Sequence, residues 1–261
     1  MRFRLIAVDA GRSLTMPDCL DPRQQDHDTL VAERSGASMR IVRAGWLFAL
    51  IAVGLQSGAE LTNAFALADA HAGLDAAIDG NAFDWISSAL AMAGAISLLV
   101  LAAAGTGRRR STIVLALLIA FLAVDDLINL HDQAATAFAG ALPEPFDRLG
   151  AWSMPILYTP LLAATFALLW SHGTRASPER AHQIQAALTL LTAAVVLRLL
   201  VGLLEIRGFH ASERIRVIGI ATLEGAEVGA WSLIAAAFVA QLAEVVSGGR
   251  AAQNDRRCGL A

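Results

Sequence analysis

Carboxylate side chains inside apolar sequence are the residues of this chain best suited to chemistry. They are Glu60, the pair Asp125 and Asp126, and the pair Glu224 and Glu227. An ionisable side chain at the middle of a membrane-spanning helix costs at least about 2.5–3.5 kcal/mol, so it usually marks a functional site. Carboxylates can ligate a metal ion, bind another cation or exchange protons, and each of these chemistries is a hypothesis here.

A divalent metal cation, zinc, manganese or iron, is the first predicted ligand of these acids. Carboxylates combined with histidine suit such ions, and a bound metal activates water for hydrolysis. The substrate would be a lipid or a lipid-linked molecule. We predict Asp125, His131, Glu224 and Glu60 as metal ligands, and Asp126 and Glu227 as catalytic general bases. Four more polar residues are expected to line the site: Arg198, Asn129, Asp132 and Tyr158.

The charge balance of these residues leaves three functions open. Five acids face one base, Arg198, and a buried excess of that size needs protons, a cation or water to compensate it. A metal-dependent hydrolase and a proton- or cation-coupled transporter would both use such acids. The third alternative is a non-catalytic scaffold or assembly subunit, in which Arg198 pairs with Glu224 or Glu227 to join two helices.

Six apolar stretches must position these residues, and each is long enough to cross about 30 Å of hydrocarbon as a helix. The chain is 56% hydrophobic and 16% charged, whereas soluble domains have about 45–50% and about 25%. We therefore predict an all-α, polytopic membrane protein with six transmembrane helices. They cover 44–67, 84–104, 112–132, 152–171, 185–206 and 217–244.

Polar segments flank this six-helix domain, 44–244, at both ends. Residues 1–43 and 245–261 are predicted to be cytoplasmic tails. The composition of 1–38 is typical of a disordered segment. Alternatively, synthesis begins at Met39, and 1–38 is not translated.

Helical spacing predicts which polar residues share a face. Asp125, Asn129 and Asp132 follow one another at i, i+4 and i+7, which turns Asp126 about 100° away. Counted from the predicted outer helix ends, four charged residues lie at similar depth, about 10–15 Å below the surface. These residues are Glu60, Asp125, Arg198 and Glu224. We predict one shared polar cavity that opens outward.

The first predicted helix has a polar face of its own, formed by Gln56, Glu60 and Asn63 at intervals of four and three residues. Two pairs of glycines, Gly54-x-x-x-Gly58 and Gly225-x-x-x-Gly229, have the spacing that lets membrane helices pack closely.

Arginine indicates the orientation. Fifteen of the 20 arginines lie in the two tails and in 105–111 and 172–184, so the positive-inside rule places both termini in the cytoplasm. We therefore expect a multi-pass protein of a bacterial-type inner membrane. His172 and His182 are expected to be solvated on the cytoplasmic side.

Composition also excludes several classes of function. The chain has no lysine, so it cannot form a retinal or pyridoxal-phosphate Schiff base. A net charge of -3 argues against nucleic-acid binding. The expected partners are the lipid bilayer, a lipid or small-molecule substrate, and a second copy of the chain in a homodimer.

Overall fold

The computed structural model is all-helical over the residues that it describes, which are 22–67, 82–105, 108–130, 133–134, 136–137, 150–206 and 212–258. Each predicted apolar stretch corresponds to one long helix. The helices are α1 (Pro22–Ala66), α2 (Ala82–Ala103), α3 (Arg109–Ile128), α5 (Gly150–Gly173), α6 (Pro178–Ile206) and α7 (Glu213–Cys258).

Within this described part, five helical segments are long and apolar enough to cross a membrane. They are Gly36–Ala66, Asp84–Ala103, Arg109–Ile128, Pro178–Leu200 and Ile215–Ser247. Large apolar side chains such as Leu47, Leu50, Leu117 and Ile215 remain exposed on their outer faces. Lipid tails would cover such a surface. In α5 the side chains are described only from Tyr158 onward, so part of the predicted fourth span lies outside the described residues.

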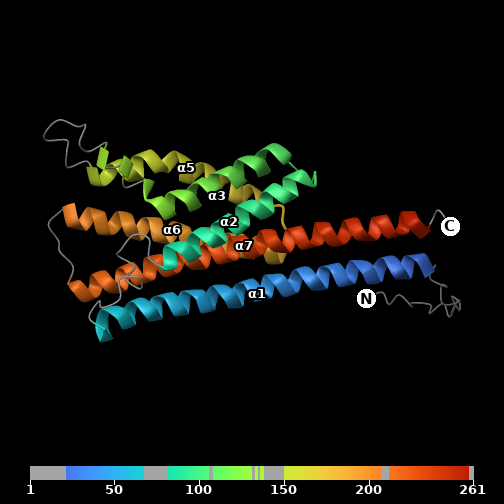
Figure 1. Cartoon of the computed structure of the whole chain (residues 1–261), viewed down its shortest axis with the longest axis horizontal. Helices are drawn as coiled ribbons and strands as arrows, with labels where there is room; N and C mark the ends of the chain where they lie inside the picture. Colours follow the sequence, from blue (N-terminus) through green and yellow to red (C-terminus); the bar gives the residue numbers. More distant parts are fainter. Residues whose placement is uncertain are drawn as a thin grey trace, which may run out of the picture.

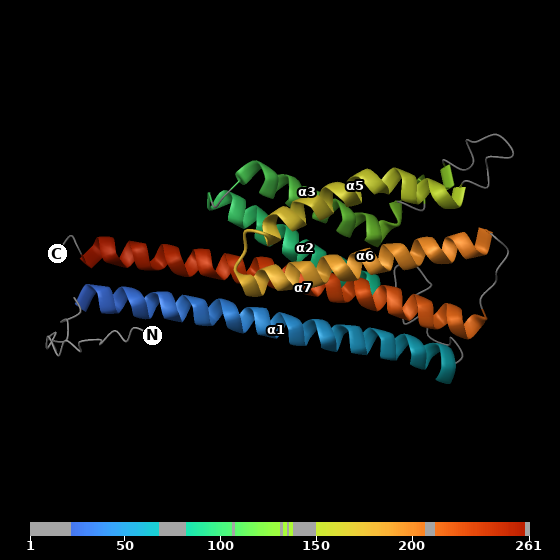
Figure 2. The same cartoon turned by 180° about the vertical axis from the view of Figure 1, so that it is seen from behind.

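Helix α7 is the centre of the bundle. It packs against α1, α2 and α6, while α3 packs against α2 and α5 against α6. Figures 1 and 2 show α1 and α7 side by side and antiparallel, and both extend beyond the other helices at one end. The beginning of α1 and the end of α7 therefore lie at the same end of the molecule. The described core contains Leu98, Leu115, Ile119, Leu233, Ile234 and Phe238, all almost fully buried.

The long helices α1 and α7 begin and end beyond the predicted spans. Helix α1 begins at Pro22, so residues 22–43 continue the span as helix, and α7 continues to Cys258. Residues 1–21 lie outside the described residues.

One face of α1 forms a narrow buried seam against α7. Its buried residues recur about every 3.5 positions, which is the period of packed antiparallel and parallel helix pairs. They are Ser38, Val42, Ala49, Gln56, Glu60 and Asn63. The predicted face of Gln56, Glu60 and Asn63 is confirmed, because these side chains are only 1%, 3% and 1% exposed.

Two of the glycine positions behave as the packing prediction requires, and two do not. A Cβ at Gly225 would come within 2.9 Å of Ser57 Oγ, and one at Gly229 within 2.9 Å of Val53 Cγ2. Those glycines let α7 approach α1 closely. Gly54 and Gly58 have nothing within 4 Å of their Cβ positions, so their pair is not used in packing within the described chain.

Helix α3 ends earlier than predicted. Its last residue is Ile128, and Asn129 adopts the left-handed conformation (φ 51°, ψ 42°), which asparagine tolerates better than most residues. The side-chain amide of Gln133 donates to the Ile128 carbonyl at 2.9 Å. The Asn129 N–H still bonds to the Asp125 carbonyl, whereas Asp132 lies outside the described residues, so the common helical face of Asp125, Asn129 and Asp132 stays a prediction.

Tight turns connect the helices at the end where α1 begins. Gly105, with φ 74°, lies just beyond the end of α2, where a left-handed residue commonly terminates a helix. Helix α6 starts with Pro178, preceded by Ser177, whose carbonyl accepts the first helical hydrogen bond from Ala181 at 2.8 Å. These turns bring α2, α3, α5 and α6 close together beside α7.

Candidate functional site: an acidic cluster

Four acids and one arginine come together near the end of the bundle where α6 is followed by α7. Asp84 lies in the first turn of α2, Asp126 lies near the end of α3, and Glu224 and Glu227 lie in the first half of α7. The charges of Asp84, Asp126 and Arg198 act on both α7 glutamates. We call these five residues the acidic cluster.

Arg198 on α6 contributes the positive charge. Its Nη2 lies 3.2 Å from Glu224 Oε1, so the predicted ion pair between α6 and α7 is confirmed. The Arg198 side chain is 50% exposed and that of Glu224 only 17%. The arginine therefore reaches the glutamate from the periphery of the bundle, and the acids occupy the interior side.

Asp126 is held by α2. Its Oδ2 accepts hydrogen bonds from Ser87 Oγ at 2.8 Å and from Ser88 Oγ at 3.1 Å. Both serines are buried, at 4% and 7% exposed. Hydroxyl donors stabilise a carboxylate charge without neutralising it, so Asp126 still adds to the negative charge of the cluster.

Glu227 accepts a hydrogen bond from the side chain of Trp231, one helical turn further along α7. Trp231 is 5% exposed. An indole N–H that is buried needs an acceptor, and Glu227 provides one. This contact explains why one tryptophan lies in the middle of an apolar segment rather than at its end.

Asp125 lies outside the acidic cluster. Its Oδ1 accepts a hydrogen bond from Tyr158 Oη at 2.7 Å, so it faces α5. Our sequence prediction put Asp125 on the shared face and turned Asp126 away from it. The structure reverses these two positions, because α3 presents Asp126 to α2 and α7. Tyr158, which we predicted only to line the site, thus donates to Asp125.

The remaining predicted site residues are not brought into the acidic cluster by a described contact. Glu60 lies in the seam of α1 against α7, and Asn129 ends α3. His131 and Asp132 lie outside the described residues. In the described part of the seam, both polar side-chain atoms of Gln56 are buried without a hydrogen-bond partner.

Sequence reasoning missed the residues that surround the acids. Ser87 and Ser88 follow Asp84 by three and four positions, so helical spacing could have placed all three on one side of α2. Trp231 follows Glu227 by four positions in the same way.

Carboxyl groups that act on one another beside an arginine can take up and release a proton or a cation. Among the residues that the structure describes, no group of three or more histidine, cysteine, aspartate or glutamate side chains is placed to hold one metal ion. The acids of the cluster act on one another through space, and serine and tryptophan side chains bind Asp126 and Glu227.

Comparison with known protein families assigns the chain to one of them. Residues 41–242 match the model of a family described as Domain of unknown function (DUF8692). The chain belongs to this family. The matched region of the family contains the whole acidic cluster and leaves out the first part of α1 and the last part of α7. Neither the curated proteins nor the solved structures gave a significant match.

Proposed function

We propose that the acidic cluster binds and releases a proton or a small cation, and that the protein is a cation- or proton-coupled membrane protein. One observation carries this proposal: four carboxyl groups from three helices act on one another around one arginine that is bonded to Glu224. If all five groups are ionised, the cluster carries three uncompensated negative charges.

The physical argument is the cost of that excess. Like charges that act on one another repel strongly where water is scarce, so at least one acid keeps a proton or shares a cation. Arg198 is half exposed and competes with an incoming cation for Glu224. Binding of the cation would displace Arg198 from Glu224, and release of the cation would restore the ion pair.

The surrounding membrane topology is part of the proposal. We infer six spans in a bacterial-type inner membrane, with both termini in the cytoplasm. Two observations support this topology. The beginning of α1 and the end of α7 lie at the same end of the bundle (Figure 1). Arg108, Arg109 and Arg110 lie where α3 begins, as the positive-inside rule expects of a cytoplasmic segment. Labelling of Cys258 in a Cys19→Ser variant tests it: we expect labelling by an impermeant reagent in inverted vesicles and not in right-side-out vesicles.

A metal-dependent hydrolase would use the same acids, with Asp126 and Glu227 as general bases and a lipid or lipid-linked substrate. That activity requires one zinc, manganese or iron per chain. We favour exchange instead, because Arg198 already supplies a displaceable positive charge at Glu224.

Proton release on cation binding tests the proposal. Purified protein in weakly buffered detergent solution is titrated with sodium, potassium, magnesium, manganese or zinc chloride while a pH indicator records released protons. We expect at least one cation to release protons in proportion to protein. The variant Asp126→Asn/Glu227→Gln should lose this release.

Two single variants serve as matched controls. Asp125→Asn removes an acid adjacent to the cluster in sequence but bonded to Tyr158, and Glu179→Gln removes an acid in the first turn of α6. Both should release protons as the unmodified chain does. Equal loss in Asp125→Asn and in the double variant would contradict the assignment, and no release with any cation would refute the proposed function.

A further inference from the structure

A cavity of about 230 Å³ lies at the end of the bundle opposite to the acidic cluster. The α2–α3 turn, the α5–α6 turn and the side of α7 border it. We call it the arginine cavity, because its polar lining includes three arginines beside one histidine and two hydroxyl side chains. These residues are Arg108, Arg175, Arg180, His172, Ser111 and Thr112.

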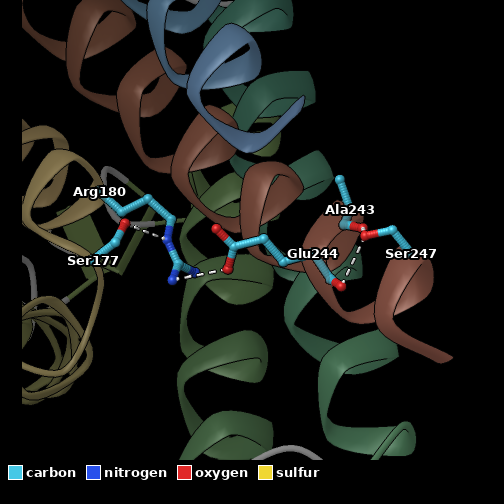
Figure 3. Close-up of polar contacts among 5 residues, drawn as sticks. All are labelled: Ser177, Arg180, Ala243, Glu244 and Ser247. Carbon is cyan, nitrogen blue, oxygen red and sulfur yellow. Dashed lines mark hydrogen bonds and ion pairs between the residues drawn. The ribbon is translucent and has the colours of Figure 1, made fainter. Parts of the chain in front are cut away.

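Arg180 is the buried charge of this cavity, at 9% exposed. Figure 3 shows it between Ser177 and Glu244: its Nε donates to Ser177 Oγ at 3.1 Å, and its Nη2 lies 3.1 Å from Glu244 Oε2. The third nitrogen, Nη1, is buried and has no hydrogen-bond partner among the described residues. Buried guanidinium N–H groups are costly to leave unpaired, so this nitrogen calls for an acceptor.

His172 is half-buried in the cavity wall, which corrects our expectation that it is solvated. The Leu168 carbonyl lies 2.9 Å from His172 Nδ1 and can only accept, so Nδ1 carries a proton. His172 Nε2 lies 3.3 Å from Thr112 Oγ1, and the ring packs edge-on against Phe238. The ring orientation is therefore held on three sides.

Two helices also begin at this cavity. Ser111 and Thr112 belong to the first turn of α3, and Arg180 belongs to the first turn of α6. Helix N-termini carry partial positive charge and favour anions. Around the cavity, this contribution adds to that of three guanidinium groups, whereas Glu244 supplies a negative charge that is already paired.

We propose that the arginine cavity binds a phosphate group. Arginine forks match the geometry of phosphate oxygens, and three arginines line the cavity, of which, within the described residues, only Arg180 is paired with a carboxylate, that of Glu244. The cavity volume of about 230 Å³ is large enough for a phosphate group and neighbouring atoms. This site is separate from the acidic cluster and does not depend on the function proposed for it.

The phosphate could belong to an anionic lipid headgroup or to free inorganic phosphate. Trp170 on α5, 56% exposed, lies two residues before His172, and exposed tryptophans are typical of the headgroup region of a membrane. Basic pockets between membrane helices bind anionic headgroups for the same electrostatic reason. Both sources present the same chemistry to Arg180.

Two measurements on the purified chain in detergent test the proposal and distinguish the sources. Native mass spectrometry compares retention of dioleoyl phosphatidylglycerol with that of dioleoyl phosphatidylcholine, and calorimetry follows titration with sodium phosphate against sodium chloride of equal ionic strength. Selective retention of phosphatidylglycerol identifies a lipid headgroup site. Phosphate binding without that selectivity identifies a site for the free anion.

Variants then assign the binding to the cavity. Arg175→Gln removes an exposed lining arginine, and Arg180→Gln/Glu244→Gln removes the buried pair together so that neither partner stays charged. Each should weaken binding roughly tenfold, as expected for loss of a charge-assisted contact. Arg43→Gln, an exposed arginine on α1 that does not line the cavity, should bind unchanged. Unchanged binding in both cavity variants, or no binding of either probe, would overturn the proposal; circular dichroism checks that each variant is folded.

Discussion

The two ends of the helix bundle carry opposite charge. At one end, four acids lie close to one half-exposed arginine; at the other, three arginines and a histidine line a cavity, and Glu244 pairs with one of these arginines, Arg180. Both α3 and α7 run from one end to the other. Fourteen residues separate Thr112 from Asp126 and Glu227 from Gln241, so the two regions lie about 21 Å apart along the helices.

The difference lies in what each region lacks. The acidic cluster has hydrogen-bond donors from serine and tryptophan but too little positive charge. The arginine cavity has a buried donor, Arg180 Nη1, for which the described part of the chain provides no acceptor. A cation would complete the first region and an anion the second. We therefore predict that the same kind of substitution changes the free energy of unfolding in opposite directions at the two ends.

Close helix packing offers the largest expected effect. A Cβ at Gly45 of α1 would overlap the Cβ of Ala236 and come within 2.9 Å of Gln183 Nε2, which donates to the Val42 carbonyl. Gly45→Ala should lower the free energy of unfolding by about 2 kcal/mol, because the Cβ of Ala236 cannot move away without shifting a helix. Equilibrium unfolding in mixed micelles measures the change.

Substitution of Gly225, a glycine of α7 near the acidic cluster, should lower the free energy of unfolding less than substitution of Gly45. A Cβ at Gly225 meets Ser57 Oγ at 2.9 Å, and this hydroxyl can rotate away. Gly225→Ala should therefore cost about 1 kcal/mol or less, while Gly54→Ala, with open space around it, should be neutral or stabilising by up to about 1 kcal/mol. Equal losses at Gly45 and Gly225 would show that the two ends are packed alike.

The variant Tyr158→Phe tests whether Asp125 is separate from the acidic cluster. Tyr158→Phe removes the hydroxyl that donates to Asp125 at 2.7 Å and leaves a carboxylate that is 5% exposed. We expect a loss of about 1.5–2 kcal/mol in unfolding free energy, since hydrogen bonds to charged groups are stronger than neutral ones. Proton release on cation binding should persist, and its loss would place Asp125 in the cluster after all.

Local sequence patterns predicted the helices and one polar face, because both depend on periodicity within a single segment. The buried face of Gln56, Glu60 and Asn63 was predicted from their spacing along one helix. The rotation of α3 could not be predicted in the same way. We predicted the inward face of α3 from Asn129 and Asp132, which follow the last residue of the helix. The packing of α3 against α2 and α5 instead decides whether Asp125 or Asp126 faces α7.

The arginine cavity was also beyond sequence reasoning. Arg108 and Arg175 are 67 positions apart, and each by itself is typical of a positively charged loop. Only the packing of the α2–α3 turn beside the α5–α6 turn makes them neighbours of one cavity. The ion pair of Arg198 and Glu224 was predictable because opposite charges in two adjacent spans have few other partners.

Replacing one glutamate by glutamine at each end should shift stability in opposite directions. Glu224→Gln removes one negative charge from an excess, so it should raise the unfolding free energy by up to about 1 kcal/mol. Glu244→Gln leaves the buried Arg180 guanidinium without its carboxylate, so it should lower that free energy by about 1 kcal/mol, a modest value because Glu244 is 32% exposed.

The converse substitution checks that charge, and not packing, causes this reversal. Arg198→Gln removes the positive charge of the acidic cluster and should destabilise the fold, in contrast to Glu224→Gln. If both variants of this pair destabilise equally, the contact acts as an ordinary bridge between α6 and α7. The charge excess would then be compensated by some group other than Arg198.

The smallest effect distinguishes the two serines that bind Asp126. Ser87 donates at 2.8 Å and Ser88 at 3.1 Å to the same Oδ2 atom, so each can partly replace the other. Ser88→Ala should cost about 0.5 kcal/mol and Ser87→Ala slightly more, whereas the double variant should cost more than their sum, because Asp126 then loses both donors. A double-mutant cycle in unfolding free energy measures this coupling. Strict additivity would mean that water or another group replaces the serines, and Asp126 would then be open to solvent rather than enclosed by α2.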